Sequence, residues 1–170
     1  MKLFTDWGFS WEGWRHNQRG EYWVVAQAIL ILGLFFLPAY RPSGLMLTPP
    51  WIYITWGVAG LVAGLAIALF GKGLLDLGKS LTPLPYPRDD GALVQSGVYG
   101  IVRHPVYSGV ILVVLSLAIA QLSLSHLLAT AILFIFFNAK ASREEEWLRQ
   151  KYPDYDAYQQ RVKKLIPWVY

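Results

Sequence analysis

Three long segments of this 170-residue chain contain no Asp, Glu, Lys or Arg, and they constrain its fold more than any other feature. They are residues 22–40, 42–71 and 105–139. A helix that crosses the hydrocarbon core of a bilayer needs about 20 consecutive apolar residues. Because these segments make up about half of the chain, they are too extensive to be hidden as core helices of a soluble protein of this size. A hydrophobic content of 55% also excludes a disordered chain.

The sequence predicts an all-α membrane protein with about four transmembrane helices. Residues 22–40 and 51–71 supply one helix each. The segment 105–139 is too long for one helix, because 35 residues at ~1.5 Å each would extend roughly 50 Å across a core of about 30 Å. We therefore expect a helical hairpin that turns near residues 121–126, where the polar residues of this segment cluster. Cytoplasmic helices then follow in the C-terminal tail.

The distribution of the fifteen Lys and Arg predicts the orientation of these helices. With four spans, fourteen of the basic residues, including Lys2 in the N-terminal tail, lie on one side and only Arg41 lies on the other. The positive-inside rule then makes both termini cytoplasmic. We interpret this one-sided charge as that of a multi-pass integral membrane protein and not as a nucleic-acid-binding surface.

We interpret residues 1–170 as a single membrane domain with two halves. Residues 1–71 hold the N-terminal tail and the first two spans, and residues 72–170 hold the last two spans and most of the polar chain. Gly57, Gly60 and Gly64 lie near one stripe of the second span, which is typical of close helix packing. The partner of this stripe is either another span or a second copy of the chain in a homodimer.

The polar residues that could carry chemistry lie in two cytoplasmic segments. In the first, Arg103 and His104 directly precede Pro105, which is favoured in the first turn of a helix. A cation beside the free N–H groups of a helix N-terminus suits a carboxylate or a phosphate; the alternative is a basic anchor that faces lipid headgroups. With no Cys and three scattered His, no metal site is predicted.

In the second polar segment we expect the fourth span to continue as a helix through residues 140–151 and to end before Pro153. Glu145 and Arg149 would form an i, i+4 pair on it. Without further context, the three acids at 144–146 are best interpreted as a solvated helix face. A short basic helix over 154–164 would then lie on anionic lipid.

The order of several motifs is more specific than any one of them. Leu-Thr-Pro-Leu-Pro stands at 81–85, and Leu93-Val94 and Gly97-Val-Tyr99 follow. Arg-His-Pro-Val-Tyr-Ser-Gly stands at 103–109, and Glu144-Glu145 precede a tail with Leu-Ile-Pro at 165–167. Over residues 72–168 this set resembles the isoprenylcysteine carboxyl methyltransferase family, integral-membrane methyltransferases with phospholipid and thiol methyltransferase relatives. Departures are Val98, where the family often has Pro, and Tyr152-Pro153, where it often has Phe-Gly.

The resemblance implies methyl transfer from S-adenosylmethionine (SAM), held by the cytoplasmic parts of the last two spans. The acceptor would be lipophilic or small, namely an isoprenylcysteine-type carboxylate, a lipid amine or a thiol, and would enter from the bilayer. The implied catalytic residues are Arg103, His104 and Glu144, with Arg103 and Glu144 compensating each other's charge and His104 as the base for an amine or thiol. The implied cofactor-binding residues are Leu93, Val94, Gly97, Val98, Tyr99, Gly100, Arg103, His104, Tyr107, Glu144 and Glu145.

Two other interpretations of these motifs remain open at this point. Membrane sterol or steroid reductases that use NADPH also place Arg-His-Pro before a Tyr and end in a sequence like Ile166-Pro-Trp-Val-Tyr170, although they usually have Asn where Val106 stands. The other alternative is a non-enzymatic helical membrane protein whose basic tail binds lipid.

Overall fold

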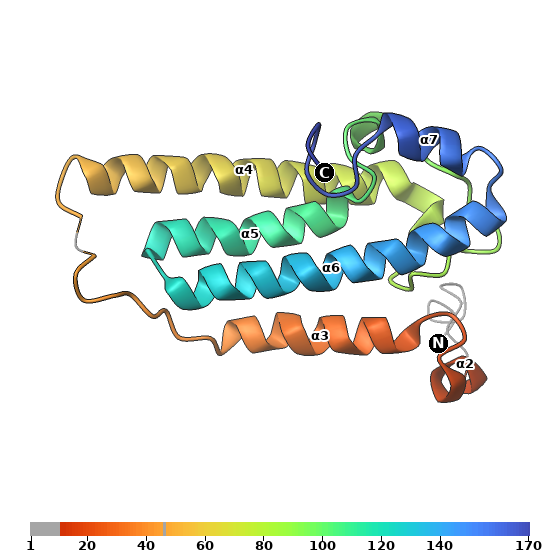
Figure 1. Ribbon diagram of the computed structural model, residues 1–170, viewed down its shortest axis with the longest axis horizontal. Helices are drawn as coiled ribbons and strands as arrows, with labels where there is room; N and C mark the ends of the chain where they lie inside the picture. The colour runs from red at the N-terminus through yellow and green to blue at the C-terminus, as the bar shows by residue number, and fades with distance from the viewer. Residues whose placement is uncertain (1–10, 46) are drawn as a thin grey trace.

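The computed structural model describes residues 11–45 and 47–170, and in these ranges it is helical, with one isolated parallel bridge between Val102 and Lys163 (Figure 1). The all-α class is therefore confirmed, while Lys2, which entered the charge count, lies outside the described residues. The elements are α2 (Trp11–His16), α3 (Glu21–Phe35), α4 (Trp51–Leu77), η1 (Gly78–Ser80), η2 (Gly97–Gly100), α5 (Pro105–Gln121), α6 (Leu124–Lys151) and α7 (Tyr155–Arg161).

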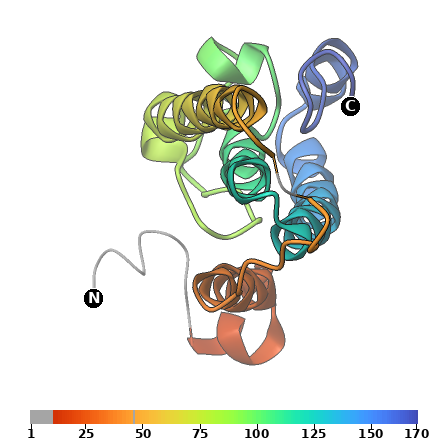
Figure 2. The same cartoon turned by 90° about the vertical axis from the view of Figure 1, so that its left-hand side faces the viewer.

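The four long helices run side by side, with α5 between α4 and α6 and with α3 beside α6 (Figures 1 and 2). The rings of Trp23 and Phe136 join α3 to α6 at a centroid distance of 5.5 Å. At one end of the bundle lie α2, η2, α7 and the segment between α4 and α5, and at the other end lie residues 36–45 and 47–50 and the α5–α6 turn. The two polar segments of the sequence therefore meet at the same end.

The lengths of the helices bear on the prediction of four spans. In the described ranges, two helices are long and apolar enough to cross a membrane, namely α4 with its extension to Ser80 (30 residues) and α6 (28 residues). The helices α3 and α5 are apolar but have only 15 and 17 residues, or about 22 and 26 Å at ~1.5 Å per residue. Helix α3 ends at Phe35, shortly before Pro38, which cannot continue a helix. The prediction of four spans is thus confirmed only in part.

The predicted hairpin is confirmed, and its turn lies where the polar cluster indicated. Leu122 adopts a left-handed conformation (φ 50°) that ends α5. Ser123 then caps α6, because its Oγ accepts a hydrogen bond from the backbone N–H of His126 at 3.3 Å. Helix α6 continues without interruption through residues 140–151, as predicted, and ends at Lys151 before Pro153.

Glycines bring α4 and α5 together, but they are not the glycines of the predicted stripe. A Cβ on Gly109 would lie 2.8 Å from Cβ of Phe70, and one on Gly73 would lie 2.9 Å from Cγ2 of Val106. Gly57, Gly60 and Gly64 have no described atom within 4 Å of such a Cβ. The stripe therefore packs against no other span in the described ranges, and a homodimer through it stays a prediction.

Candidate active site

Helix α4 holds the segment that precedes α5. Asp76 Oδ2 accepts a hydrogen bond from the Val98 N–H at 2.9 Å, and the Tyr99 hydroxyl donates to the Gly73 carbonyl at 3.2 Å. Gly97 has φ +60°, and a Cβ there would lie 2.1 Å from Asp76 Oδ2. Glycine is thus required at position 97 by the close approach to α4. No motif of the sequence marks Asp76, which is a lone acid in the last turn of an apolar helix.

The C-terminal tail returns to the start of α5 and uses the hydrogen-bond donors there. The Arg103 N–H donates to the Lys163 carbonyl at 2.8 Å, and the His104 N–H donates to the Lys164 carbonyl at 3.1 Å. Ser108 Oγ donates to the Leu165 carbonyl at 2.7 Å. Pro105 occupies the first turn of α5, as predicted. The backbone N–H groups of Arg103 and His104, which precede the helix, thus bind the protein's own tail, and an anion at the free N–H groups of the first turn of α5 stays a prediction.

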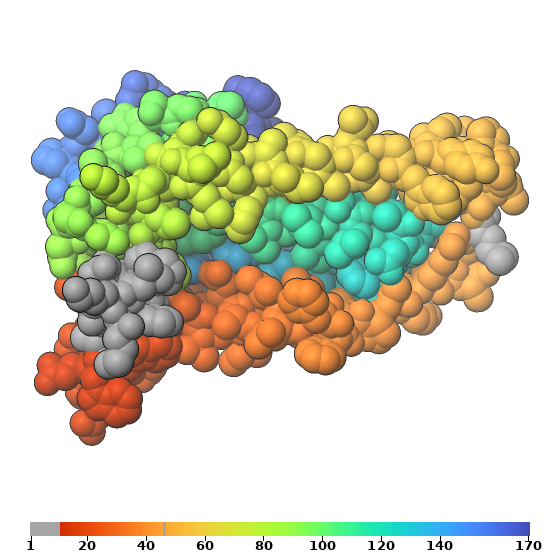
Figure 3. Space-filling view, turned by 180° about the vertical axis from the view of Figure 1, so that it is seen from behind, coloured from red at the N-terminus to blue at the C-terminus, as the bar shows by residue number. Residues whose placement is uncertain are grey.

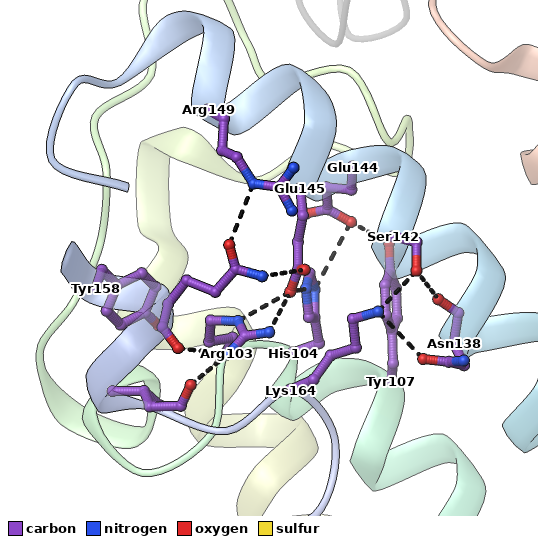
Figure 4. A network of polar contacts seen from close by, with 12 residues as sticks. Arg103, His104, Tyr107, Asn138, Ser142, Glu144, Glu145, Arg149, Tyr158 and Lys164 are labelled. Carbon is purple, nitrogen blue, oxygen red and sulfur yellow. Dashed lines mark hydrogen bonds and ion pairs between the residues drawn. The ribbon is translucent and has the colours of Figure 1, made fainter. Parts of the chain in front are cut away.

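Arg103 pairs with Glu145 in the interior of this end of the bundle (Figure 4). Its Nε and Nη2 each lie 2.8 Å from Glu145 Oε1, and the two side chains are only 7% and 2% exposed. Its Nη1 donates to the carbonyls of Gln159, at 3.2 Å, and of Val162. Two expectations are thereby corrected, since Arg103 compensates Glu145 and not Glu144, and Glu145 does not pair with Arg149.

His104 lies between two carboxylates. Its Nε2 is 3.0 Å from Glu145 Oε1, and its Nδ1 is 3.8 Å from Glu144 Oε2. The imidazole stacks on the Tyr107 ring at 5.4 Å, and the Tyr107 hydroxyl donates to Glu144 Oε2 at 2.7 Å (Figure 4). Because Nε2 is engaged with Glu145, Nδ1 is the ring nitrogen on the side of Glu144.

The three consecutive acids of α6 have three different environments. Glu145 is buried on Arg103, and Glu146 pairs with Arg143 at the surface. Glu144 has a side chain that is 25% exposed and lines a cleft shared with His104. Consecutive helix residues are separated by about 100° around the axis, so only one of the three can face the cleft. The helix register thus selects Glu144 as the acid of the cleft.

This cleft gathers residues from the 77–94 segment, from η2 and the two positions before α5, and from α6 and α7. Of the residues implied by the family resemblance, seven line it or its extension along α5: Leu93, Val94, Tyr99, Arg103, His104, Tyr107 and Glu144. Four do not line it: Gly97, Val98, Gly100 and Glu145. The structure adds lining residues that were not assigned to a site from the sequence: Leu84, Leu148, Tyr152, Tyr155 and Tyr158. The sequence feature that could have assigned some of these residues to the site is their short distance from the Glu144–Glu145 pair. It applies to Leu148, Tyr155 and Tyr158.

Tyrosines of the tail close the cleft. The Tyr158 hydroxyl donates to the Tyr99 carbonyl at 2.7 Å, and the Tyr152 hydroxyl donates to the Gly91 carbonyl at 2.7 Å. Burial raises the pKa of Tyr158 and of Tyr155, so both phenols stay protonated. The Tyr155 side chain is buried and lines the cleft, and its hydroxyl bonds to no residue in the part of the chain that the structure describes.

An apolar groove begins one helical turn beyond the cleft. The cleft reaches Val106 and Tyr107 on α5, and the groove starts at Val110. It continues along Val113 and Leu117, between Leu34 of α3 and Phe70 of α4. Figure 3 shows α5 exposed at the bottom of the hollow between α3 and α4. The polar cleft and an apolar surface open to a bilayer are therefore neighbours.

Comparisons with known proteins identify the family of this chain. The phospholipid methyltransferase family matches residues 53–155. Protein-S-isoprenylcysteine O-methyltransferase B of Arabidopsis thaliana is 30% identical over 153 residues, which are 88% of this chain and 75% of that protein. A probable protein-S-isoprenylcysteine O-methyltransferase of Oryza sativa subsp. indica is 30% identical over 115 residues, or 62% of this chain. The chain spans 60% of the length of this rice relative.

A solved structure shares the fold. The eukaryotic intramembrane Ras methyltransferase, an isoprenylcysteine carboxyl methyltransferase, superposes with a TM-score of 0.63 over 91% of this chain and 54% of that one, at 22% identity. The fold and the matched segment define the class as that of the membrane-embedded phospholipid methyltransferases. Within it, the chain belongs to the isoprenylcysteine carboxyl methyltransferase family, which confirms the resemblance found in the sequence.

Proposed function

We propose that this chain is a SAM-dependent methyltransferase of the membrane, which methylates a lipophilic acceptor at the cleft beside Glu144 and His104. The observation that carries the proposal is the junction of two unlike sites. A polar cleft with one partly exposed acid, Glu144, meets, within one turn of α5, an apolar groove between α3 and α4. A water-soluble donor and a membrane-soluble acceptor could thus reach one point from opposite directions.

The residues of the cleft fit the chemistry of SAM. Its sulfonium and ammonium require an anion, and Glu144 supplies a carboxylate whose Oε1 accepts no hydrogen bond from the described residues. Its adenosine requires an apolar and aromatic wall, which Leu84, Leu93, Leu148 and Tyr155 would supply. When bound, SAM would supply the electrophilic methyl group. Arg103 has its guanidinium committed to Glu145 and the tail, so we assign it the role of holding His104 and the tail in place.

The protein's own part in the reaction is then to orient the acceptor and, for some acceptors, to remove a proton. Displacement at a methyl group depends strongly on positioning, and a carboxylate acceptor is already a nucleophile. An amine or a thiol must lose a proton, and His104 Nδ1, 3.8 Å from Glu144 Oε2, is placed to receive it. Stacking on Tyr107 fixes the plane of the imidazole.

A thermal titration of the purified chain in detergent tests the cofactor assignment. We expect SAM to raise the unfolding temperature and NADPH to leave it unchanged, because a ligand stabilises only the protein that binds it. A rise with NADPH alone would favour the reductase interpretation and refute ours. Incubation with methyl-labelled SAM and three acceptor classes, a prenylated cysteine carboxylate, a lipid amine and a small thiol, then identifies the acceptor.

A further inference from the structure

A second polar cleft lies on the opposite side of the Arg103–Glu145 pair from the proposed methyl-transfer site. It encloses about 430 Å³, and its lining includes Ser142 and Arg149 of α6, Gln159 of α7, and Lys163, Lys164 and Tyr170 of the tail. Figure 4 shows Arg149, Ser142 and Lys164 near this pair. It shares Arg103 with the first cleft but contains neither Glu144 nor His104.

The charge of this second cleft is positive. Of its two acids, Glu145 is neutralised by Arg103 and Glu146 by Arg143. Among the described residues, the one acid that forms an ion pair with Arg149, Lys163 or Lys164 is Asp156, whose Oδ1 is 3.6 Å from Arg149 Nε at an exposed position. Lys164 Nζ donates to Ser142 Oγ at 2.7 Å and to Asn138 Oδ1 at 3.2 Å, which are neutral partners.

Lys163 gives the cleft a cation available for a ligand. Its side chain is exposed, and its ammonium makes no hydrogen bond or ion pair with any residue in 11–45 or 47–170. Its backbone is nevertheless fixed, because the Lys163 carbonyl accepts the hydrogen bond of the Arg103 N–H at 2.8 Å. A free ammonium on an anchored backbone is suited to an anion, and the neighbouring guanidinium of Arg149 is suited to a phosphate.

An apolar groove of about 740 Å³ adjoins the basic cleft. It is lined by Leu65 of α4, Leu112 of α5, Ala131 of α6 and Ile166 of the tail, among others. The Tyr170 ring, which lines the cleft, lies 6.1 Å from the Phe134 ring, which lines the groove. This groove lies on the other face of α5 from the α3–α4 groove.

Helix α6 connects the cleft and the groove along a single face. Residues three or four apart along it change from Ala131 and Phe134 to Asn138 and Ser142, and Arg149 follows two turns later, beyond the neutralised Glu145. Such a gradient matches a molecule with an anionic head and an apolar tail at the surface of a membrane. The neighbouring Trp168 is 83% exposed, as is typical of an aromatic residue at a membrane interface.

We propose that the second cleft and this groove together bind one anionic phospholipid, with its phosphate at Lys163 and Arg149 and its acyl chains along α4, α5 and α6. This site is separate from the methyl-transfer cleft and does not depend on SAM. The bound lipid would hold the tail segment 162–167, which in turn holds Arg103.

The test uses the full chain in neutral detergent and four probes: dioctanoyl phosphatidate, dioctanoyl phosphatidylcholine, glycerol phosphate and inorganic phosphate. Binding is followed by the unfolding temperature as a function of probe concentration. The variants are Lys163→Glu in the cleft and Ala131→Phe in the groove. The matched control is Lys79→Glu, which makes the same change of charge at an exposed position at the same end of the bundle.

We expect phosphatidate to stabilise the wild type at lower concentrations than any other probe. Lys163→Glu should lower the affinity for phosphatidate by about fivefold or more. Lys79→Glu should leave that affinity unchanged. Ala131→Phe should lower the affinity for phosphatidate but not the affinity for glycerol phosphate. Equal affinity for inorganic phosphate and phosphatidate would show that the site binds free phosphate, and it would refute the proposal that the ligand is a lipid. Equal effects of phosphatidate and phosphatidylcholine, or equal loss in Lys79→Glu, would refute the assigned charge recognition.

Discussion

Arg103 Nη2 and Glu145 Oε1 lie 2.8 Å apart, with both side chains almost completely buried between α5, α6 and the tail. The same arginine binds two backbone carbonyls near α7, and the same glutamate binds His104. One ion pair therefore joins the polar start of α5, the polar end of α6 and the returning tail. A buried pair of this kind contributes more to the choice of one arrangement than to net stability.

Removing one partner of this pair should unfold the polar end. Arg103→Gln leaves Glu145 buried without its cation, and we expect a loss of about 3–5 kcal/mol in the free energy of unfolding. Replacing both partners, as Arg103→Met with Glu145→Leu, should cost less than the single change, because no uncompensated charge remains. Chemical denaturation of the three variants measures both quantities. A single variant as stable as the wild type would show that the pair does not hold this end together.

Changing the acid of the cleft should affect the ligand and not the fold. Glu144→Gln keeps the shape of the side chain but removes the charge that we assign to SAM, so its affinity should fall about tenfold or more, with little change in the unfolding temperature without ligand. Calorimetric titration with SAM measures the affinity. Glu146→Gln, on the outer face of the same helix, is the control. The assignment fails if both variants lose the same affinity.

Two neighbouring tyrosines should separate stability from binding. Tyr158→Phe deletes the hydrogen bond to the Tyr99 carbonyl and should cost about 1 kcal/mol of stability. Tyr155→Phe deletes a hydroxyl that has no hydrogen-bond partner among the described residues, so it should leave the free energy of unfolding unchanged. It should lower the affinity for SAM, because the Tyr155 side chain lines the cleft. Since burial raises both pKa values, the two effects should be constant between neutral pH and pH 9. A stability loss in Tyr155→Phe larger than that in Tyr158→Phe would contradict this division.

Glycines on two faces of the α4–α5 pair should respond differently to the same change. Gly109→Ala places a Cβ 2.8 Å from Phe70 Cβ, and such overpacking should cost about 1–3 kcal/mol. Gly60→Ala meets no described atom and should be neutral or slightly stabilising, because alanine favours a helix. Thermal unfolding in detergent compares them. A penalty at Gly60 equal to that at Gly109 would instead indicate a partner on the glycine stripe.

The sequence predicted much of the fold because its strongest signals are local. Runs without charge mark helices, and the polar cluster at 121–126 marks the turn at Ser123. Pro153 correctly marked the end of α6. The predicted length of the first span was wrong for a local reason as well, since Pro38 stands inside the charge-free run and α3 ends before it.

The pairing of the charges could not be predicted, because it depends on contacts between distant segments. Three adjacent glutamates differ only in their angle around α6, and the position of α5 decides which one meets Arg103. The return of the tail to Val102 is a single bridge without a strand pattern in either segment. The sequence therefore indicated which residues gather at this end, but not that Arg103 would face Glu145 and the tail carbonyls.

The bridge between Val102 and Lys163 also concerns the biosynthesis of the protein. Chains begin to fold from the N-terminus while they are being made, and helices α3 to α6 all precede the tail in this chain. The hydrogen-bond acceptors for Arg103 and His104 lie at residues 159–164, which leave the ribosome after every long helix has been made. The membrane bundle can thus assemble first, and the cleft is completed only when residues 159–164 have been synthesised.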